Sequence, residues 1–183
     1  MKKLSVFPAT SNLPIQLDAT CNGIQHLASL IGDLKLAKLV NLMNSKPCEK
    51  PVDLYSYSLK LIDDDVKTFI SNNPQYSRLT LIKFNRKMVK KSIMTKSYNV
   101  TLKGTEQYVL NMFRKEFDKE QNIMYFKPLK SKDPDIKFTI QQIGLLTKII
   151  YNVLYTIHPE LKLLVDYLAA MAKILNKLNQ PIV

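Results

Sequence analysis

The sequence has few of the features that mark secreted, metal-binding or membrane-spanning proteins. Its two cysteines, Cys21 and Cys48, have no metal-ligand spacing and no histidine cluster beside them, so we expect reduced thiols in an intracellular protein. The basic start of the chain is followed by no apolar stretch long enough for a secretory signal. The most apolar run, residues 143–157, is interrupted by Lys148 and Asn152 and is too short to span a bilayer. We therefore expect a soluble protein that has no membrane partner.

Acidic residues are missing from one long stretch of the chain. Residues 66–105 contain nine lysines and arginines and no aspartate or glutamate, so nine of the twelve net positive charges lie in forty residues. A stripe of this kind favours binding to a polyanion. The alternative is a solvated helix face in a lysine-rich protein, because the chain has 24 lysines and only 3 arginines, a ratio typical of AT-rich coding sequence.

The apolar content of 46% is sufficient for a packed core. Hydrophobic periodicity and turn residues predict a mainly α protein with one or two short strands. The predicted elements are a strand over residues 13–17, helices over 24–31, 35–43, 52–70, 84–98, 105–119, 139–156 and 159–178, and irregular chain over 118–137.

A candidate metal ligand stands at the end of the predicted strand. Asp18 precedes an Asn22-Gly23 turn, so its carboxylate can project into a cleft and bind Mg²⁺, with the Ala19 carbonyl as a second oxygen ligand. Two-metal phosphoryl transfer uses ions roughly 3.5–4 Å apart, and one aspartate cannot hold both. The alternative for Asp18 is a helix-capping or turn residue, which is a common role for an aspartate after a strand.

The predicted basic helix carries a second candidate site. Arg86, Lys90, Met94 and Tyr98 are spaced by four and form one stripe. The two cationic groups suit triphosphate oxygens. Tyr98, about 18 Å from Arg86 at a rise of 1.5 Å per residue, would lie near the sugar and base, with Met94 against the base. The alternative is an amphipathic surface helix that buries its apolar residues, Met88, Ile93 and Met94.

Together the two segments resemble the single-subunit DNA-dependent RNA polymerases of phages, mitochondria and linear mitochondrial plasmids. The resemblance spans almost the whole chain. It is carried by Asp18-x-x-x-x-Gly23-Ile24-Gln25-His26 and by Arg86-x-x-x-Lys90-Lys91-Ser92-x-Met94-Thr95-x-x-Tyr98, in the order of the family. Asn41-Leu42, Asp53-Leu54-Tyr55 and residues 146–153 also resemble the fingers of that family. Asn99 stands where phage members often have glycine, which favours the plasmid branch.

The resemblance implies the palm start and fingers of a right-hand polymerase. Residues 1–33 would begin the palm, 34–178 would form helical fingers, and 179–183 would return to the palm. Asp18 and Ala19 would hold catalytic Mg²⁺. Lys90 would act in catalysis and bind the incoming ribonucleoside triphosphate together with Arg86, Lys91, Met94 and Tyr98, and Tyr98 would help select ribose over deoxyribose. The partners would be a DNA template and nascent RNA, in a mitochondrion.

The family pattern is incomplete in this sequence. Its second metal carboxylate lies in a His-Asp element, whereas here His26 precedes Leu27 and His158 precedes Pro159. Only seventeen residues precede Asp18, too few for a promoter-binding domain and thumb, and the final residues, 179–183, resemble the approach to the missing palm strand. We therefore expect a fragment that is inactive alone. The alternatives are a basic module that binds nucleic acid or nucleotide without chemistry, and one part of a split polymerase completed by a second chain.

Overall fold

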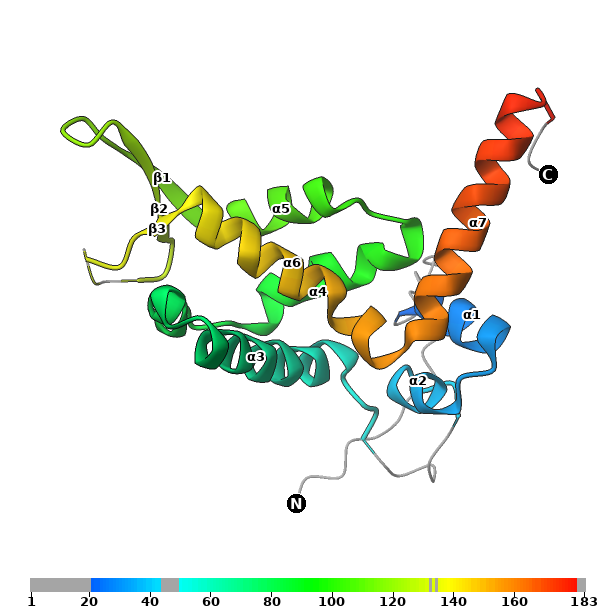
Figure 1. Ribbon diagram of the computed structural model, residues 1–183. Coiled ribbons are helices and arrows are strands. Elements are labelled where there is room, and N and C mark those ends of the chain that lie inside the picture. The colour runs from blue at the N-terminus through cyan, green and yellow to red at the C-terminus, as the bar shows by residue number, and fades with distance from the viewer. Residues whose placement is uncertain (1–20, 44–49, 132, 134, 181–183) are drawn as a thin grey trace, which may run out of the picture.

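The computed structural model describes residues 21–43, 50–131, 133 and 135–180, and within them the chain is mainly helical, as predicted. Figure 1 shows the arrangement. The elements are α1 (Asn22–Ile31), α2 (Leu34–Leu39), α3 (Leu54–Asn72), the 3₁₀ helix η1 (Pro74–Leu81), α4 (Arg86–Met94), the 3₁₀ helix η2 (Thr95–Tyr98), α5 (Leu102–Leu110), β1 (Phe113–Asp118), β2 (Ile123–Pro128), β3 (Phe138–Thr139), α6 (Ile140–Ile157) and α7 (Pro159–Lys177). None of the helices in these ranges is both long and apolar enough to cross a membrane.

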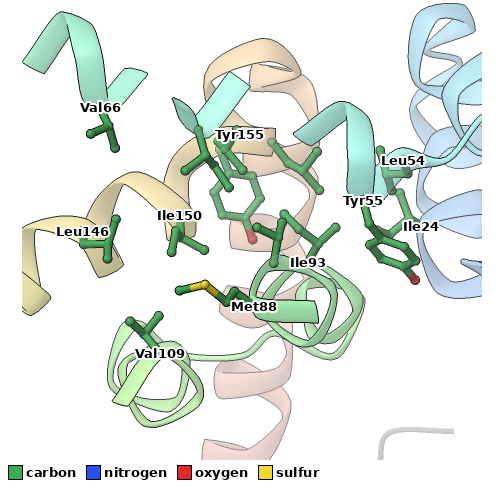
Figure 2. Packing of buried hydrophobic residues seen from close by; sticks show 14 of the residues in the cluster. Ile24, Leu54, Tyr55, Val66, Met88, Ile93, Val109, Leu146, Ile150 and Tyr155 are labelled. Carbon is green, nitrogen blue, oxygen red and sulfur yellow. The ribbon is translucent and has the colours of Figure 1, made fainter. Parts of the chain in front are cut away.

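Helix α6 is the centre of the core. It begins at a capping box in which Thr139 and Gln142 satisfy each other's backbone N–H groups. It packs against α3, α4 and α5, and its apolar residues are buried where these helices meet. In Figure 2 Ile150 of α6, Met88 of α4 and Val109 of α5 point toward one another, so the basic helix α4 rests on the core through its apolar side.

Helix α7 leaves α6 at His158–Pro159 and packs against α1 (Figure 1). The junction is held by His158, whose Nδ1 lies 2.5 Å from Asp33 Oδ2. Asp33 also caps α2, since its Oδ1 accepts hydrogen bonds from the backbone N–H groups of Lys35 and Leu36. Burial raises the pKa of the Asp33 carboxyl, but the hydrogen bonds from Leu36 and His158 outweigh it and hold the pKa below its usual value. One carboxylate therefore joins the α1–α2 turn to the α6–α7 turn.

The start of α3 is held by two side chains. Asp53 caps the helix by accepting a hydrogen bond from Tyr55 N at 3.1 Å. Asn41 has a left-handed backbone, with φ of 60°, and its amide exchanges two hydrogen bonds with the backbone of Val52, at 2.8 and 2.7 Å. This fixes α3 beside the end of α2, which stops at Leu39 rather than at the predicted Met43.

The predictions for residues 105–119 and 118–137 were partly wrong, because these residues contain a β-hairpin. α5 ends at Leu110, and β1 pairs antiparallel with β2 from Phe113↔Pro128 to Asp118↔Ile123, while β3 adds to β2. The hairpin is favoured because Phe113 and Phe126 share the face that meets the core, and Phe138 packs edge-on against Phe113 at 6.2 Å. The predicted strand over 13–17 lies outside the described residues.

The Asp33–His158 pair yields a stability prediction. We expect Asp33→Ala to lower the free energy of unfolding by about 2–4 kcal/mol, because it uncaps α2 and leaves the buried His158 without its partner. Urea denaturation at pH 7 measures this change.

Asp63→Ala is the matched control for this measurement. It removes an exposed carboxylate that pairs with Lys67 one helical turn away at 2.6 Å, and an ion pair this exposed to solvent contributes little to stability. Equal losses for the two variants would show that the Asp33–His158 pair does not hold the helix junctions.

Candidate functional site

One pocket combines the two segments that the sequence analysis selected. It has a volume of about 290 Å³ and opens between the start of α1, the start of α3, α4 and η2. All four residues of the predicted stripe line it, together with the start of α1. Its lining residues are Cys21, Asn22, Gly23, Ile24, Tyr55, Arg86, Lys90, Met94, Ser97 and Tyr98.

Helix α4 presents the stripe because its other side is anchored in the core. Asn85 caps the helix by accepting a hydrogen bond from Met88 N at 3.2 Å. The inward side buries Met88, Val89, Ser92 and Ile93. Met94, by contrast, is 41% exposed and Tyr98 is 70% exposed, both at the pocket. The alternative of an amphipathic helix is therefore right for Met88 and Ile93, which are buried, and wrong for Met94.

The helix tightens into the 3₁₀ helix η2 before it ends. Asn99 ends it in a left-handed conformation, with φ of 53° and ψ of 43°. Glycine and asparagine adopt this conformation with the least strain. The left-handed backbone at this position therefore explains why an asparagine is suited to it.

Arg86 does not face the pocket as a free cation. Its guanidinium binds Asp53 through two hydrogen bonds, Nε to Oδ2 at 2.6 Å and Nη2 to Oδ1 at 3.2 Å. The hydrogen bonds from Arg86 lower the pKa of the Asp53 carboxyl to about 2 against the opposing effect of burial. The guanidinium also lies 5.0 Å from the ring centroid of Tyr55. Asp53 and Tyr55 thus fix the orientation of Arg86.

Lys90 is the less constrained cation of the pocket. Its Nζ lies 5.8 Å from the ring centroid of Tyr55, and within the described ranges no carboxylate comes within ion-pairing distance of it. Lys91, also predicted to bind nucleotide, does not line the pocket. Its Nζ lies 4.6 Å from the ring centroid of Tyr108 in α5. The structure therefore gathers Arg86 and Lys90 and directs Lys91 elsewhere.

Tyr55 is a pocket residue that the sequence analysis named only within Asp53-Leu54-Tyr55, as part of the family resemblance, and not as a site residue. It is almost fully buried, and its hydroxyl accepts a hydrogen bond from Cys21 Sγ at 3.2 Å. Burial raises the pKa of its phenol above the ordinary value, so the ring stays neutral. Tyr55 contacts both Arg86 and Lys90, which are more than thirty residues away in the sequence, and no local sequence pattern predicts these contacts.

Gly23 allows the two halves of the pocket to meet. A Cβ at this position would lie 2.3 Å from Ser97 Oγ and 2.5 Å from Ser97 Cβ, closer than side chains tolerate. The predicted Asn22-Gly23 turn is instead the first turn of α1. Glycine is therefore required at position 23 because α1 and η2 approach each other closely there, and not because the chain turns.

The two predicted metal ligands, Asp18 and Ala19, lie outside the described residues. Among the residues that the structure does describe, no group of three or more histidine, cysteine, aspartate or glutamate side chains is placed to hold a metal ion.

The close approach at Gly23 gives a testable prediction. We expect Gly23→Ala to lower the free energy of unfolding by about 1–3 kcal/mol, the usual effect of overpacking, because Ser97 Cβ cannot rotate away. Adding Ser97→Gly should recover most of this loss, which a double-mutant cycle in urea measures.

Gly144→Ala in α6 is the control, since a Cβ there has nothing within 4 Å and alanine favours a helix by roughly 0.5–1 kcal/mol. A Gly23→Ala chain as stable as the wild type would show that α1 and η2 are not in close contact.

Comparison with known proteins shows the family of the chain. A family model described as DNA-dependent RNA polymerase matches residues 5–182. A probable DNA-directed RNA polymerase of Neurospora crassa is 37% identical over 175 residues, covering 94% of this chain and 19% of that protein. One from Agaricus bitorquis is 36% identical over 187 residues, covering 99% of this chain and 16% of the relative.

A relative named as mitochondrial is also similar. The mitochondrial DNA-directed RNA polymerase of Schizosaccharomyces pombe is 29% identical over 166 residues, covering 91% of this chain and 13% of that polymerase. The chain thus spans about a fifth or less of the length of these relatives. Because the family model matches all but a few residues at each end, the chain belongs to the DNA-dependent RNA polymerase family.

Proposed function

We propose that this chain supplies the fingers and the first metal-binding segment of a DNA-directed RNA polymerase. The reaction would be templated transfer of nucleotides from ribonucleoside triphosphates to nascent RNA. The observation that supports this best is the pocket in which Arg86, Lys90, Met94 and Tyr98 meet the start of α1. In the proposed division, residues 1–33 begin the palm, 34–178 form the fingers, and 179–183 return toward the palm.

The cations of the pocket would receive the triphosphate. The free ammonium of Lys90 is a mobile point charge suited to phosphate oxygens, and in the reaction it would stabilise the charge that develops on them. Arg86 uses two of its five N–H donors on Asp53, so three remain for phosphate. Because Asp53 is anionic, it limits the net charge near Arg86 while it fixes the guanidinium plane. Lys91, which points to Tyr108, would contact the template or nascent strand instead.

Tyr98 and Met94 would contact the nucleoside. Both side chains are exposed at the pocket wall beyond Lys90, toward the C-terminal end of the stripe. A thioether packs readily against a base, and a phenol hydroxyl can exchange a hydrogen bond with a sugar hydroxyl. This arrangement would let Tyr98 distinguish ribose from deoxyribose.

Mg²⁺ would be the metal of the reaction. A carboxylate and a backbone carbonyl, as Asp18 and Ala19 offer, are the hard oxygen donors that Mg²⁺ prefers. Asp18 precedes the pocket residue Cys21 by three positions in the sequence. When bound, the metal ions stabilise charge on the attacking and leaving oxygens. One aspartate cannot hold both ions, so catalysis requires a second carboxylate that this chain does not offer in a His-Asp element.

Exposed basic residues in and around the pocket support a nucleic-acid partner. Of the nine in residues 66–105, Lys67 and Arg86 pair with aspartates and Lys96 is buried, which leaves six exposed to bind a polyanion. These six are Arg78, Lys83, Lys87, Lys90, Lys91 and Lys103. We propose a DNA template and nascent RNA as the partners, and the mitochondrion as the location because several relatives are named as mitochondrial.

A second candidate function is that of one part of a split polymerase. The observation in its favour is an exposed apolar stripe on α7, at spacings of three and four residues, formed by Leu163, Tyr167, Met171, Ile174 and Leu178. The partner would be a polypeptide that carries the second metal carboxylate. Its co-purification with the wild-type chain from the native source, and its loss on Leu163→Glu, would support this function, whereas a wild-type chain that purifies alone would contradict it.

The triphosphate site is tested by a pair of charge-matched variants. We expect Lys90→Gln to weaken binding of Mg-ATP to the full chain by about tenfold or more, because it removes a pocket cation that pairs with no carboxylate among the described residues. Lys87→Gln removes the same charge from the same helix outside the pocket, and it should change the affinity by less than about twofold. Isothermal titration calorimetry measures both affinities. Equal losses would favour a basic module that attracts anions without a nucleotide site.

Activity of the chain gives a further prediction. We expect the isolated chain to show no templated RNA extension with Mg²⁺, because a single aspartate cannot hold two ions. Extension of a labelled RNA primer on a DNA template measures this, and extension that disappears in Asp18→Ala would contradict it.

A further inference from the structure

A buried lysine lies directly behind the pocket. Lys96 of η2 is only 2% exposed, and within the described part of the chain its Nζ has no hydrogen-bond partner. Two tyrosines of α6 surround it instead. The Nζ lies 3.0 Å from the ring centroid of Tyr151 and 4.3 Å from that of Tyr155. The ammonium is therefore held by aromatic faces rather than by a carboxylate.

Consecutive residues of η2 contact three different parts of the molecule. Lys96 points into α6, Ser97 lies against Gly23 of α1, and Tyr98 lines the pocket. The carbonyl of Lys96 also accepts a hydrogen bond from Asn99 N at 3.0 Å, which closes the turn after Tyr98. A four-residue 3₁₀ helix has weak internal hydrogen bonds, so these outside contacts determine where Tyr98 lies.

Opposing effects act on the pKa of the Lys96 amine. Burial, followed by the nearby charge of Lys162 on α7, lowers the pKa of the Lys96 amine to about 7. The faces of Tyr151 and Tyr155 oppose this by attracting the cation. Burial raises the pKa of Tyr155 to about 12, so this phenol stays neutral near pH 7.

Two further charged groups, Lys162 and Asp166 of α7, lie near Lys96 and Tyr155. The ammonium of Lys162 forms an ion pair with the carboxylate of Asp166, one helical turn away on α7. An apolar residue would fill the position of Lys96 at lower cost, since it needs no desolvation of an amine. Stability alone therefore does not explain the lysine.

We propose that Lys96 is a positioning residue: its ammonium, held between Tyr151 and Tyr155, fixes η2 on α6 and so sets the position of Tyr98 in the pocket. One consequence is that discrimination between ribose and deoxyribose depends on the charge of Lys96. This consequence rests on the proposed function. When the amine loses its proton, its attraction to the rings is lost, and η2 is held less firmly beside the pocket.

The first test does not require nucleotide binding. In the full chain labelled with ¹³C-methyl methionine, the methyl resonance of Met94, which adjoins η2 and lines the pocket, should shift with a midpoint near pH 7. The shift should disappear in Lys96→Met, which keeps the length of the side chain without its charge. Met124 on the distant strand β2 is the control. A Met94 resonance that does not respond to pH, or that responds equally in Lys96→Met, would overturn the proposal.

The second test measures the consequence at the nucleotide. The ratio of the affinities for Mg-ATP and Mg-dATP should fall by about three- to fivefold between pH 6 and pH 8.5 in the wild type, and stay constant in Lys96→Met. A ratio with the same pH dependence in both chains would overturn the role in sugar selection. If neither nucleotide binds at any pH, the proposed function fails, while the Met94 titration still decides whether Lys96 positions η2.

Unfolding separates positioning from a purely structural role. Because the folded pKa of Lys96 lies below the unfolded value near 10.4, the unfolded state binds more protons between pH 7 and pH 10. This group therefore makes the wild type more stable as the pH rises through that range. Lys96→Met should lack that rise and be at least as stable as the wild type at pH 6, as judged by its urea midpoint. A Lys96→Met chain that is less stable at pH 6 would show that the lysine serves stability.

Discussion

The pocket depends on the close contact of α1 with η2 at Gly23 and Ser97. Each partner in this contact is held by a different part of the core. Helix α1 packs on α7 and is tied to it through Asp33 and His158, whereas η2 is held on α6 through Lys96. Helices α6 and α7 are joined at His158. The two sides of the pocket, α1 and η2, are therefore both held in place by this pair of helices. The geometry of a polar surface site is therefore set by buried contacts behind it.

The electrostatics of the pocket assign different tasks to its two cations. Arg86 is oriented by the Asp53 carboxylate and the Tyr55 ring, which gives it a fixed direction and a partly neutralised charge. Lys90 pairs with no carboxylate among the described residues and has the freedom of a long side chain. A fixed, planar donor suits recognition of phosphate geometry, and a flexible ammonium suits charge that changes during a reaction. Behind them, in our proposal, the charge of Lys96 acts on the position of Tyr98 through the packing of η2 on α6.

Much of the helical framework could be predicted from the sequence, because apolar periodicity and capping residues are local signals. The stripe of Arg86, Lys90, Met94 and Tyr98 was predicted from its spacing, and the structure places all four at one pocket. The β-hairpin was not predicted, since its short strands carry many charges and only Phe113 and Phe126 reach the core. The contacts of Arg86 with Asp53, and of Lys96 with α6, join residues far apart in the chain, and no local pattern specifies such pairs.

In the proposed function, the pocket holds a ribonucleoside triphosphate in one orientation. A structure of the full chain with Mg²⁺ and a non-hydrolysable ribonucleoside triphosphate tests it most directly. The account predicts phosphate oxygens at Lys90 and Arg86 and the sugar beside Tyr98. A triphosphate bound away from this pocket, or bound with its base at Lys90 and its phosphates at Tyr98, would contradict the account.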